Sequence, residues 1–599
     1  MGGFCGFIAS NFESIGNEIL AAMLGRLEHR GQDIDTCLHG GVGLGLVGRG
    51  SIYPNAAMPV VLNGTISNIH NLRALLVNDG HDFETNSHAE VLQKMYAQYG
   101  VDMLSYLSGS FAFAIYDAEE DTLFCARDPF GIKPFYYTST DSGLIFGTEI
   151  KPFFMCPGFK PILNMEALGM YLTFQYSVLR ETFFAGVYKL PAGHYMVCKN
   201  GQVEIKGYST REFSPEKITL DHAVDEIDRA VISSVEKSME VEGEIGTFLS
   251  GGVDSSFLAA RFGKHGGRKA FTVGFDHENY NEIDQAKELC GHLGLTHITK
   301  IIPKDEYWRA LPEIQYYMDE PMADPAAMAF YFACKEAASH VDIALSGEGP
   351  DELFGGYNIY KEPLSLRPYS RLPLKLRKWI ATLAKKLPHR LKGRGFLLRA
   401  AKTVEERFIG NAYIFSPNER DRLLKYRTVG TPQDITRPYY NKVKHLDDIT
   451  KMQYLDINLW LTDDILQQAD KMSGAHALEL STPLLSGETF AVASKLPVKH
   501  RVSRKETKIA FRKAAARHLP TETATRKKLG FPVPIRIWLR EDKYYANVKS
   551  YFQGVAATKY FHTKELVHLL DEHYHGRADN SRKIWTVYMF LLWHEEYFL

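Results

Sequence analysis

The stretch Ile245-Gly-Thr-Phe-Leu-Ser-Gly-Gly-Val-Asp-Ser-Ser256 holds a short apolar run, two adjacent glycines and the first residues of a helical pattern. Gly251 and Gly252 let the backbone bend tightly and point its N–H groups inward. The serine hydroxyls add donors, and the helix start adds the positive end of a dipole. The stretch therefore predicts a strand, a pyrophosphate-binding loop and a helix. It is not a Walker loop, because no Gly-Lys-Ser/Thr follows the glycines.

A second loop of similar kind follows the apolar run Val341–Leu345. It begins with Ser346 and Gly347 and places Glu348, Asp351 and Glu352 within five residues. One carboxylate of such a cluster can bind Mg²⁺ while another serves as a base. An acidic surface turn would carry the same charge, but the neighbouring phosphate loop favours a metal site.

Apolar runs and helical patterns alternate through the middle of the chain. The first loop leads to a helical run at 257–262, an apolar run at 270–275 and a helical pattern at 282–293. Strands that alternate with helices favour a parallel sheet whose ligand site lies at the strand C-termini. From about residue 440 to the end the pattern is mostly helical. We therefore expect an α/β domain with a parallel sheet and many helices.

The first part of the chain has a different pattern. Residues 1 to about 205 hold short apolar runs separated by Gly, Asn and Asp, which favour strands packed with a few helices. One helix is predicted over 17–28. The polar stretch 208–217 indicates a linker. We expect two domains, one at 1–207 and one at 218–599.

The composition excludes several classes of protein. Lys and Arg number 70 and Asp and Glu 71, so no net charge draws the chain to nucleic acid. The seven cysteines form no CxxC pair, which argues against a disulfide framework or a structural zinc site. No apolar run approaches the ~20 residues of a membrane span, and no secretory signal is present. We expect a cytoplasmic protein with small-molecule substrates, for which a homodimer stays an open alternative.

One segment departs from this charge balance. Between Arg367 and Lys402 there are many Lys and Arg and no acid, interleaved with Leu, Trp379 and Phe396. Amphipathic helices with a solvated basic face are the simplest interpretation. The alternative is a surface that attracts an anionic substrate, partner or membrane.

The two loops and their order resemble those of the glutamine-dependent (class B) asparagine synthetases, over nearly the whole chain. Similar motifs in the C-terminal half are Phe271-Thr-Val-Gly-Phe275, Asp319-Glu-Pro-Met-Ala-Asp-Pro325, Asp470-Lys-Met-Ser473 and Arg526-Lys-Lys-Leu-Gly-Phe531. The N-terminal half is similar to the family's class II amidotransferase domain, which has an αββα N-terminal-nucleophile fold. The motifs there are His29-Arg-Gly-Gln-Asp33, Arg49, Asn63-Gly64, Arg127-Asp-Pro-Phe-Gly-Ile-Lys-Pro134 and Glu149-Ile-Lys151.

The resemblance implies that the C-terminal half is an ATP-pyrophosphatase domain that uses ATP and Mg²⁺. ATP would adenylate a substrate carboxylate, aspartate by default, and ammonia would attack the acyl-AMP. Asp254 and Asp351 would bind Mg²⁺. Glu348 would take a proton from incoming ammonium, and Lys528 would stabilise negative charge. The residues implied in ATP binding are Leu249, Ser250, Gly251, Gly252, Val253, Asp254, Ser255, Ser256, Val273, Ser346 and Gly347.

In the N-terminal half, the resemblance implies that a cysteine at the start of the mature chain attacks glutamine. The nearest candidate is Cys5, which lies behind Met1-Gly-Gly-Phe4 rather than directly after Met1. Four interpretations stay open: processing exposes Cys5, Cys5 works without its usual α-amine base, the site is silent, or Cys5 is a buried structural residue. The glutamine-binding residues implied are Arg49, Asn63, Gly64 and His88, of which His88 stands where the family has Asp.

Two further departures concern the acceptor. Ser481 and Ser486 stand where the family has Arg and Asp, which leaves the identity of the carboxylate open. The leading prediction is an AMP-forming amide synthetase that takes nitrogen from glutamine or ammonia. One alternative is a relative that amidates another carboxylate, on a sugar or a secondary metabolite. The other is a binding or regulatory protein with a degenerate glutaminase site, which pyrophosphate release with any acid would exclude.

Overall fold

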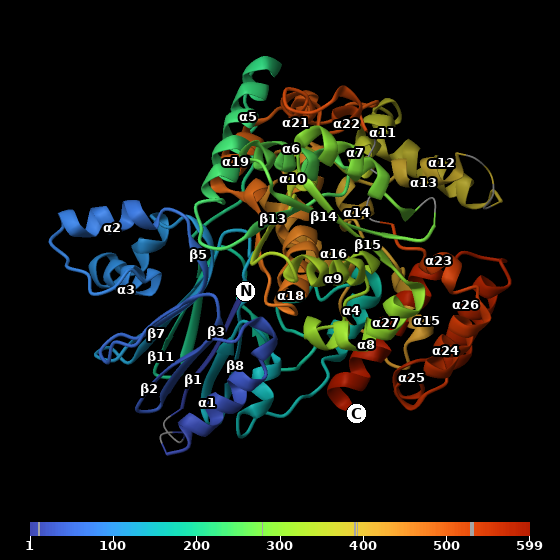
Figure 1. The fold of residues 1–599 in the computed structure, drawn as a ribbon. Coiled ribbons are helices and arrows are strands. Elements are labelled where there is room, and N and C mark those ends of the chain that lie inside the picture. The colour runs from blue at the N-terminus through green and yellow to red at the C-terminus, as the bar shows by residue number, and fades with distance from the viewer. Residues whose placement is uncertain (10–11, 13, 278–279, 389–390, 392, 527–531) are drawn as a thin grey trace.

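The computed structural model describes residues 1–599 except 10–11, 13, 278–279, 389–390, 392 and 527–531. Two β-sheets from the N-terminal part lie at the lower left of Figure 1, and a mainly helical part built around a third sheet fills the rest. Residues 208–219 connect the two parts without helix or strand. The polar stretch 208–217 lies in this connection, and the division into domains at 1–207 and 218–599 stays a prediction.

The N-terminal part contains two six-stranded antiparallel sheets. The first runs in the order β10 (Val187–Lys189), β8 (Tyr136–Thr140), β9 (Gly143–Gly147), β1 (Gly2–Ile8), β3 (Val42–Gly48) and β2 (Ile34–His39). The second runs in the order β12 (Gln202–Gly207), β11 (His194–Lys199), β7 (Thr122–Arg127), β6 (Gly109–Asp117), β5 (Val60–Ile66) and β4 (Ser51–Tyr53).

Successive side chains of a strand point to opposite faces of its sheet, so each sheet can pack against a different layer on each face. Phe4 of β1 packs with Val61 of β5 and Ala112 of β6, so one face of each sheet meets the other sheet. The opposite face of the first sheet is covered by α1 (Gly16–Gly25). The opposite face of the second sheet is covered by α2 (Ile69–Asn78) and α3 (His88–Tyr99). This arrangement confirms the αββα fold that the resemblance implied.

The third sheet confirms the predicted parallel α/β fold. Its five strands run in the order β15 (Thr296–Ile302), β14 (Lys269–Phe275), β13 (Ile245–Phe248), β16 (Ile343–Leu345) and β17 (Glu479–Ser481). All neighbours are parallel. After β13 the chain forms β14, which pairs with one edge of β13, whereas the later strand β16 pairs with the other edge of β13. The loops that follow β13 and β16 therefore lie side by side at a topological switch point.

Helices cover this sheet, and those predicted from sequence form near the expected bounds. The pattern at 282–293 gives α7 (Ile283–Leu293), and the helix that precedes β13 is α5 (Leu220–Lys237). The helices used below are α6 (Val253–Phe262), α8 (Lys304–Met318), α9 (Pro325–Ala338), α10 (Pro350–Phe354), α17 (Asp448–Asn458), α18 (Leu466–Gly474), α19 (Gly487–Lys495), α21 (Ile509–Ala515) and α27 (Ser581–Phe598).

A buried ionic network joins the two parts of the chain. The Arg30 guanidinium bonds Glu149 through Nε, and its Nη2 lies 2.6 Å from Asp470 Oδ2 of α18. Lys471 Nζ lies 2.6 Å from Asp319 Oδ2, and Asp319 Oδ1 is 2.8 Å from Lys151 Nζ. The exposed fraction of each of these side chains is at most 2%. The contact between the parts is therefore continuous protein interior.

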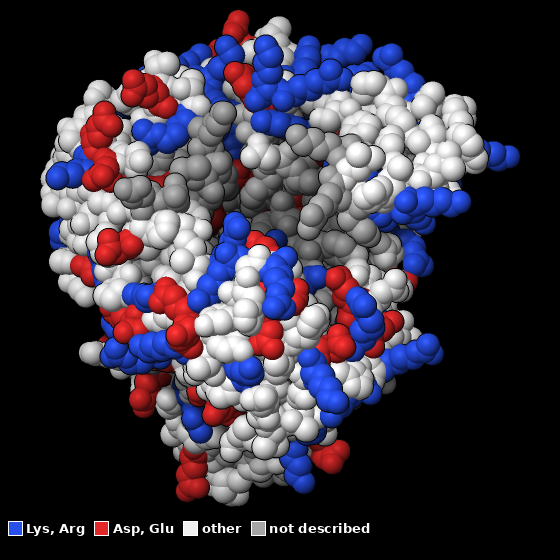
Figure 2. Space-filling model, turned by 90° about the vertical axis from the view of Figure 1, so that its right-hand side faces the viewer, with Lys and Arg blue, Asp and Glu red and all other residues white. Residues whose placement is uncertain are grey.

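The basic segment forms helices on the right side of Figure 1: α11 (Glu362–Ser370), α12 (Leu374–Lys385) and α13 (Arg394–Ala400). Figure 2 turns this side to the viewer and shows Lys and Arg side chains frequent among uncharged ones in its upper right part. Among the described residues, no helix combines the length and apolarity needed to cross a bilayer.

Candidate functional site

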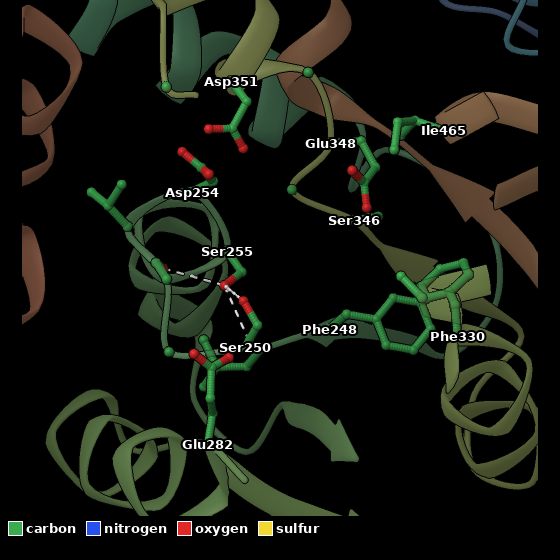
Figure 3. A pocket seen from close by; sticks show the side chains of 18 of the residues that line it. Phe248, Ser250, Asp254, Ser255, Glu282, Phe330, Ser346, Glu348, Asp351 and Ile465 are labelled. Carbon is green, nitrogen blue, oxygen red and sulfur yellow. Dashed lines mark hydrogen bonds between the residues drawn. The ribbon is translucent and has the colours of Figure 1, made fainter. Parts of the chain in front are cut away.

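The loop between β13 and α6 closes on itself through serine hydroxyls. Ser250 N donates to Ser255 Oγ at 3.2 Å, and the Ser250 and Ser255 hydroxyls lie 3.1 Å apart (Figure 3). Gly251 has φ +70°, a left-handed conformation that favours glycine. These contacts fix the loop at the N-terminal end of α6, where backbone N–H groups and the helix dipole suit a phosphate.

The loop after β16 packs directly against the first one. A Cβ added to Gly347 would lie 2.9 Å from Ser255 N and 3.1 Å from Ser255 Cα. Only glycine permits this approach of two backbones. Ser346 Oγ lies 3.3 Å from Glu348 Oε1, and α10 begins at Pro350 and carries Asp351. The two glycine-bearing loops therefore form one surface.

Asp254 of α6 and Asp351 of α10 point their carboxylates toward one another (Figure 3). Lys508 Nζ lies between them, 2.6 Å from Asp254 Oδ2 and 2.7 Å from Asp351 Oδ1. Lys508 has φ +55° immediately before α21, and its side chain is buried. A cation is thus held between the two carboxylates predicted to bind Mg²⁺.

Gly356 makes room for this arrangement. A Cβ at this position would lie 1.8 Å from Asp351 Oδ1 and 2.2 Å from Lys508 Cε. The carboxylate and the ammonium group occupy the space that any larger residue needs. The packing of Asp351 and Lys508 therefore requires glycine at position 356, the second glycine after the acidic cluster.

A cavity of about 420 Å³ opens over both loops. Phe248 and Phe330 form one wall with their rings 5.0 Å apart, edge to face. The predicted residues that line the cavity are Leu249, Ser250, Gly251, Gly252, Val253, Asp254, Ser255, Val273, Ser346, Gly347, Glu348 and Asp351. Ser256 does not line it and is buried on α6. Lys528 lies outside the described residues.

Several lining residues were not among the predicted site residues, although Arg526 opens one of the motifs named above. Lys508, Arg512 and Arg526 come from segments some 250 residues away from the first loop, and Arg526 Nη1 donates to Gly251 O at 3.1 Å. Phe330 belongs to α9. No local spacing ties these residues to either loop, and only the folded topology brings them together.

Protein carboxylates alone do not make a complete metal cage here. Among the residues that the structure describes, no group of three or more His, Cys, Asp and Glu could hold a metal ion. Mg²⁺ commonly binds through one or two carboxylates plus substrate phosphates. The facing pair Asp254 and Asp351 beside a phosphate loop fits that pattern.

The N-terminal part holds a second polar site on β5. Asn63 is fully buried, and neither polar atom of its side chain has a hydrogen-bond partner among the described residues. Gly64 follows with φ +103°, and a Cβ there would lie 2.1 Å from Ser110 O. A Cβ on Gly2 would lie 2.9 Å from Asn63 Oδ1, so the start of β1 reaches this pair.

Cys5 does not join this group. It lies three residues further along β1 and faces away from the second sheet, packed with Phe7, Ile19 and Leu20 between the first sheet and α1. Its backbone lies opposite Gly45 on one side and Gly147 on the other. Burial raises the pKa of the Cys5 thiol well above its ordinary value. The position is that of a structural core residue.

The other two residues implied in glutamine binding also make separate contacts. Arg49 Nη1 donates to Glu242 O at 3.0 Å, across the boundary between the two parts. His88 begins α3, where its Nδ1 accepts from Ile66 N at 3.4 Å. Burial lowers the pKa of His88, which favours the neutral ring. The structure thus brings together Asn63 and Gly64 but does not place Cys5, Arg49 or His88 in contact with them.

Comparison with known proteins gives the family of both parts of the chain. The Asparagine synthase family matches residues 226–595, and the Glutamine amidotransferase domain family matches residues 1–209. Asparagine synthetase [glutamine-hydrolyzing] 1 of Bacillus subtilis (strain 168) is 40% identical over 593 residues, covering 96% of this chain and 93% of that protein. A putative asparagine synthetase [glutamine-hydrolyzing] of Mycobacterium bovis is 40% identical over 549 residues, covering 89% and 84%. The chain therefore belongs to the glutamine-hydrolysing asparagine synthetase family of ATP-dependent carbon–nitrogen ligases.

Proposed function

We propose that the protein makes an amide from a carboxylate, aspartate by default, through an acyl-adenylate. A carboxylate oxygen attacks the α-phosphorus of ATP, and the bond to pyrophosphate breaks. Ammonia then attacks the acyl carbon, and AMP leaves with the bonding electrons. The single observation that carries this proposal is the contact between the two glycine-bearing loops, which presents phosphate donors and paired carboxylates to one cavity.

Each part of the cavity suits one part of ATP. The Phe248 and Phe330 wall is apolar and fits the adenine ring. The Ser250–Ser256 loop fits the phosphates. Lys508 and Arg526 supply positive charge beside them, and a positive group fixed near a leaving phosphate stabilises the transition state.

Mg²⁺ would be held by Asp254 and Asp351, and when bound it would neutralise charge on the phosphate oxygens. The facing carboxylates already hold the Lys508 ammonium, so this part of the chain is built to accept positive charge. With the ion bound by these carboxylates, Lys508 would no longer contact both of them. Its side chain would then be free to contact a phosphate oxygen.

Glu348 is our candidate for the group that takes the proton from ammonium. It stands at the cavity beside Ser346, one strand away from the phosphate loop. A carboxylate at this position can deprotonate ammonium while leaving activation of the acid untouched. Lys528 keeps its predicted role in stabilising negative charge.

The experiment is pyrophosphate release from ATP and Mg²⁺ over a panel of carboxylic acids, for the wild type and Glu348→Gln. We expect release with at least one acid, and release in the variant within a few-fold of the wild type. Amide formation in the variant should fall about 100-fold or more. Absence of release with every acid would remove the proposal. Loss of pyrophosphate release in Glu348→Gln would assign Glu348 to activation instead.

Ser481 and Ser486 bear on the choice of acid. Ser486 caps α19, and its hydroxyl lies 2.5 Å from Ser234 Oγ of α5. Ser481 ends β17, where its carbonyl accepts from Ser346 N at 2.9 Å. Neither side chain offers the positive charge that would bind a second carboxylate. A monocarboxylic acceptor is therefore the alternative to aspartate that the acid panel has to include.

The position of Cys5 favours ammonia over glutamine as the nitrogen donor of this chain. A thiol on the face of β1 opposite to Asn63 cannot attack a substrate whose carbonyl is held by that amide. Cleavage before Cys5 would also remove Gly2–Phe4 from the strand and their pairing with β3. The start of β1, which reaches Asn63, would then be lost together with the site.

This preference is tested by supplying ammonium or glutamine to the wild type, Cys5→Ala and Cys125→Ala. Cys125 is an equally buried cysteine of β7 and controls for the loss of packing. We expect ammonium to support amide formation, little glutamate from glutamine, and equal behaviour of the two variants. Glutamate release that disappears in Cys5→Ala alone would establish Cys5 as the nucleophile.

A further inference from the structure

The helix α12 presents an apolar stripe to solvent. Leu376, Trp379 and Leu383 recur at three- and four-residue steps, with exposed fractions of 41%, 60% and 46%. At 3.6 residues per turn these side chains fall within about 60° of arc on one side of the helix. Leu372 before the helix and Leu387 after it are also exposed and continue the same spacing.

The opposite side of α12 attaches it to the molecule. Ala381 and Ala384 are buried there. Arg377 Nη1 donates to Ala400 O at 2.9 Å, and Arg394 Nε donates to Ala384 O at 3.2 Å, so α12 and α13 hold one another. The apolar stripe is therefore presented by a helix that is already packed, and it is not the helix's own core face.

Basic side chains border the stripe. Lys375, Lys378 and Lys386 are exposed. At 3.6 residues per turn Lys375 and Lys386 lie next to the stripe, and Lys378 lies further round the same side. No carboxylate of a described residue lies within the ion-pair distance of 4.0 Å of these three amino groups. The sequence from 363 to 404 contains twelve Lys and Arg and no Asp or Glu, in a chain with a net charge of -1. The segment therefore carries a local excess of positive charge that the net charge of the chain does not reveal.

We propose that α12 docks in the plane of a membrane surface rich in anionic phospholipids. Its leucines and Trp379 enter the boundary between headgroups and acyl chains, and the lysine ammonium groups stay among the lipid phosphates. The α12–α13 pair projects from the molecule, so a flat surface can reach it (Figure 1). Charge alone would suit an acidic protein, but an exposed tryptophan in a leucine stripe beside lysines is the pattern of an interfacial helix.

Tryptophan fluorescence provides a specific probe of this docking. Trp379 is the exposed member of six tryptophans, and the other five have exposed fractions of 8% or less: Trp308, Trp460, Trp538, Trp585 and Trp593. We expect a blue shift of the emission when the full chain meets vesicles that contain phosphatidylglycerol. Flotation should show at least ~10-fold stronger binding to these vesicles than to pure phosphatidylcholine, and loss of most binding in 0.5 M salt.

Two variants separate the apolar and the basic contributions. Trp379→Ser with Leu383→Ser should lower vesicle binding about 10-fold or more, and so should Lys375→Glu with Lys378→Glu. Lys444→Glu with Lys499→Glu changes the net charge equally at exposed positions elsewhere and should bind as the wild type. All variants should keep wild-type pyrophosphate release, which shows that they fold.

Three results would overturn the proposal. The first is equal binding to neutral and anionic vesicles, and the second is an unshifted Trp379 emission in the presence of bound vesicles. The third is that the protein does not bind vesicles but self-associates in light scattering, and that Trp379→Ser abolishes this self-association. That last result would make the stripe a contact between two copies of the chain.

Discussion

Asp456 shows how burial sets the protonation of a single residue. It is fully buried on α17, and its Oδ2 accepts from Tyr360 Oη at 2.6 Å and from Asn411 Nδ2 at 2.8 Å. Burial raises the pKa of this carboxyl to about 8, because the lost hydration outweighs the two donors. The folded protein therefore keeps Asp456 protonated at neutral pH, whereas the unfolded chain ionises it.

Replacing Asp456 by Asn should make the protein relatively more stable as the pH rises. A raised folded pKa means that the native state binds more protons between about pH 4 and 8, so the carboxyl's stabilisation is lost across that window. Asn keeps the shape and cannot ionise. We expect the difference in free energy of unfolding to shift toward the variant by up to about 1.4 kcal/mol per pH unit. Urea titrations at acidic and alkaline pH measure it, and a constant difference would contradict the assignment.

Individual residues also show where sequence reasoning ends. The glycines and acids of the two loops were predictable because local backbone needs select them. Lys508 was not, because nothing near it in sequence reveals that α21 begins beside Asp254. Strand alternation puts Cys5 and Phe4 on opposite faces, but sequence does not tell which face meets the second sheet. Contacts between residues 40 to 140 positions apart in the sequence decide which face meets the second sheet.

At the scale of elements, the site depends on how closely two strand–loop–helix units approach. Their strands pair in parallel register, Ile245 opposite Ile343, which brings both loops to one sheet edge. The alternation of apolar runs and helical patterns was enough to predict these units and the parallel sheet. It did not predict β17 (Glu479–Ser481), because only one of its three residues is apolar, whereas all three residues of β16 are apolar.

Gly347→Ala should damage ATP use by separating the two loops. The new methyl group would meet the Ser255 backbone at 2.9 Å, and backbone cannot rotate away. We expect the KM for ATP to rise about 10-fold or more, since small displacements in a positioned site are costly. Gly291→Ala on α7 is the control, because a Cβ there has no atom within 4 Å. Equal KM values in both variants would mean that the loop contact does not position ATP.

For the whole molecule, the ionic network around Arg30 makes the two parts one structure. Arg30 contacts Glu149 and Gly2 O within its own part and Asp470 in the other. A buried pair stabilises little in net terms, but removal of one partner leaves a charge without compensation. The main effect of the network is therefore that separation of the two parts would leave buried charges without their partners.

Arg30→Met should lower the free energy of unfolding by about 3–5 kcal/mol and expose the 208–219 connection to protease. The double variant Arg30→Met with Asp470→Leu removes the stranded carboxylate and should recover part of the loss. Thermal unfolding and limited proteolysis measure both effects. Were the single and double variants equally unstable, the loss would come from packing and not from charge.

The last helix of the structure has a consequence for synthesis of the chain. Trp593 of α27 donates from Nε1 to Asp319 O at 2.7 Å and packs its ring 5.1 Å from that of Phe183. Asp319 in turn contacts Lys151 and Lys471. A nascent polypeptide that still lacks α27 leaves these groups uncovered on the ribosome. The contacts of Asp319 and Phe183 therefore stay incomplete until α27 has been made, and chaperones have access to these groups during that interval.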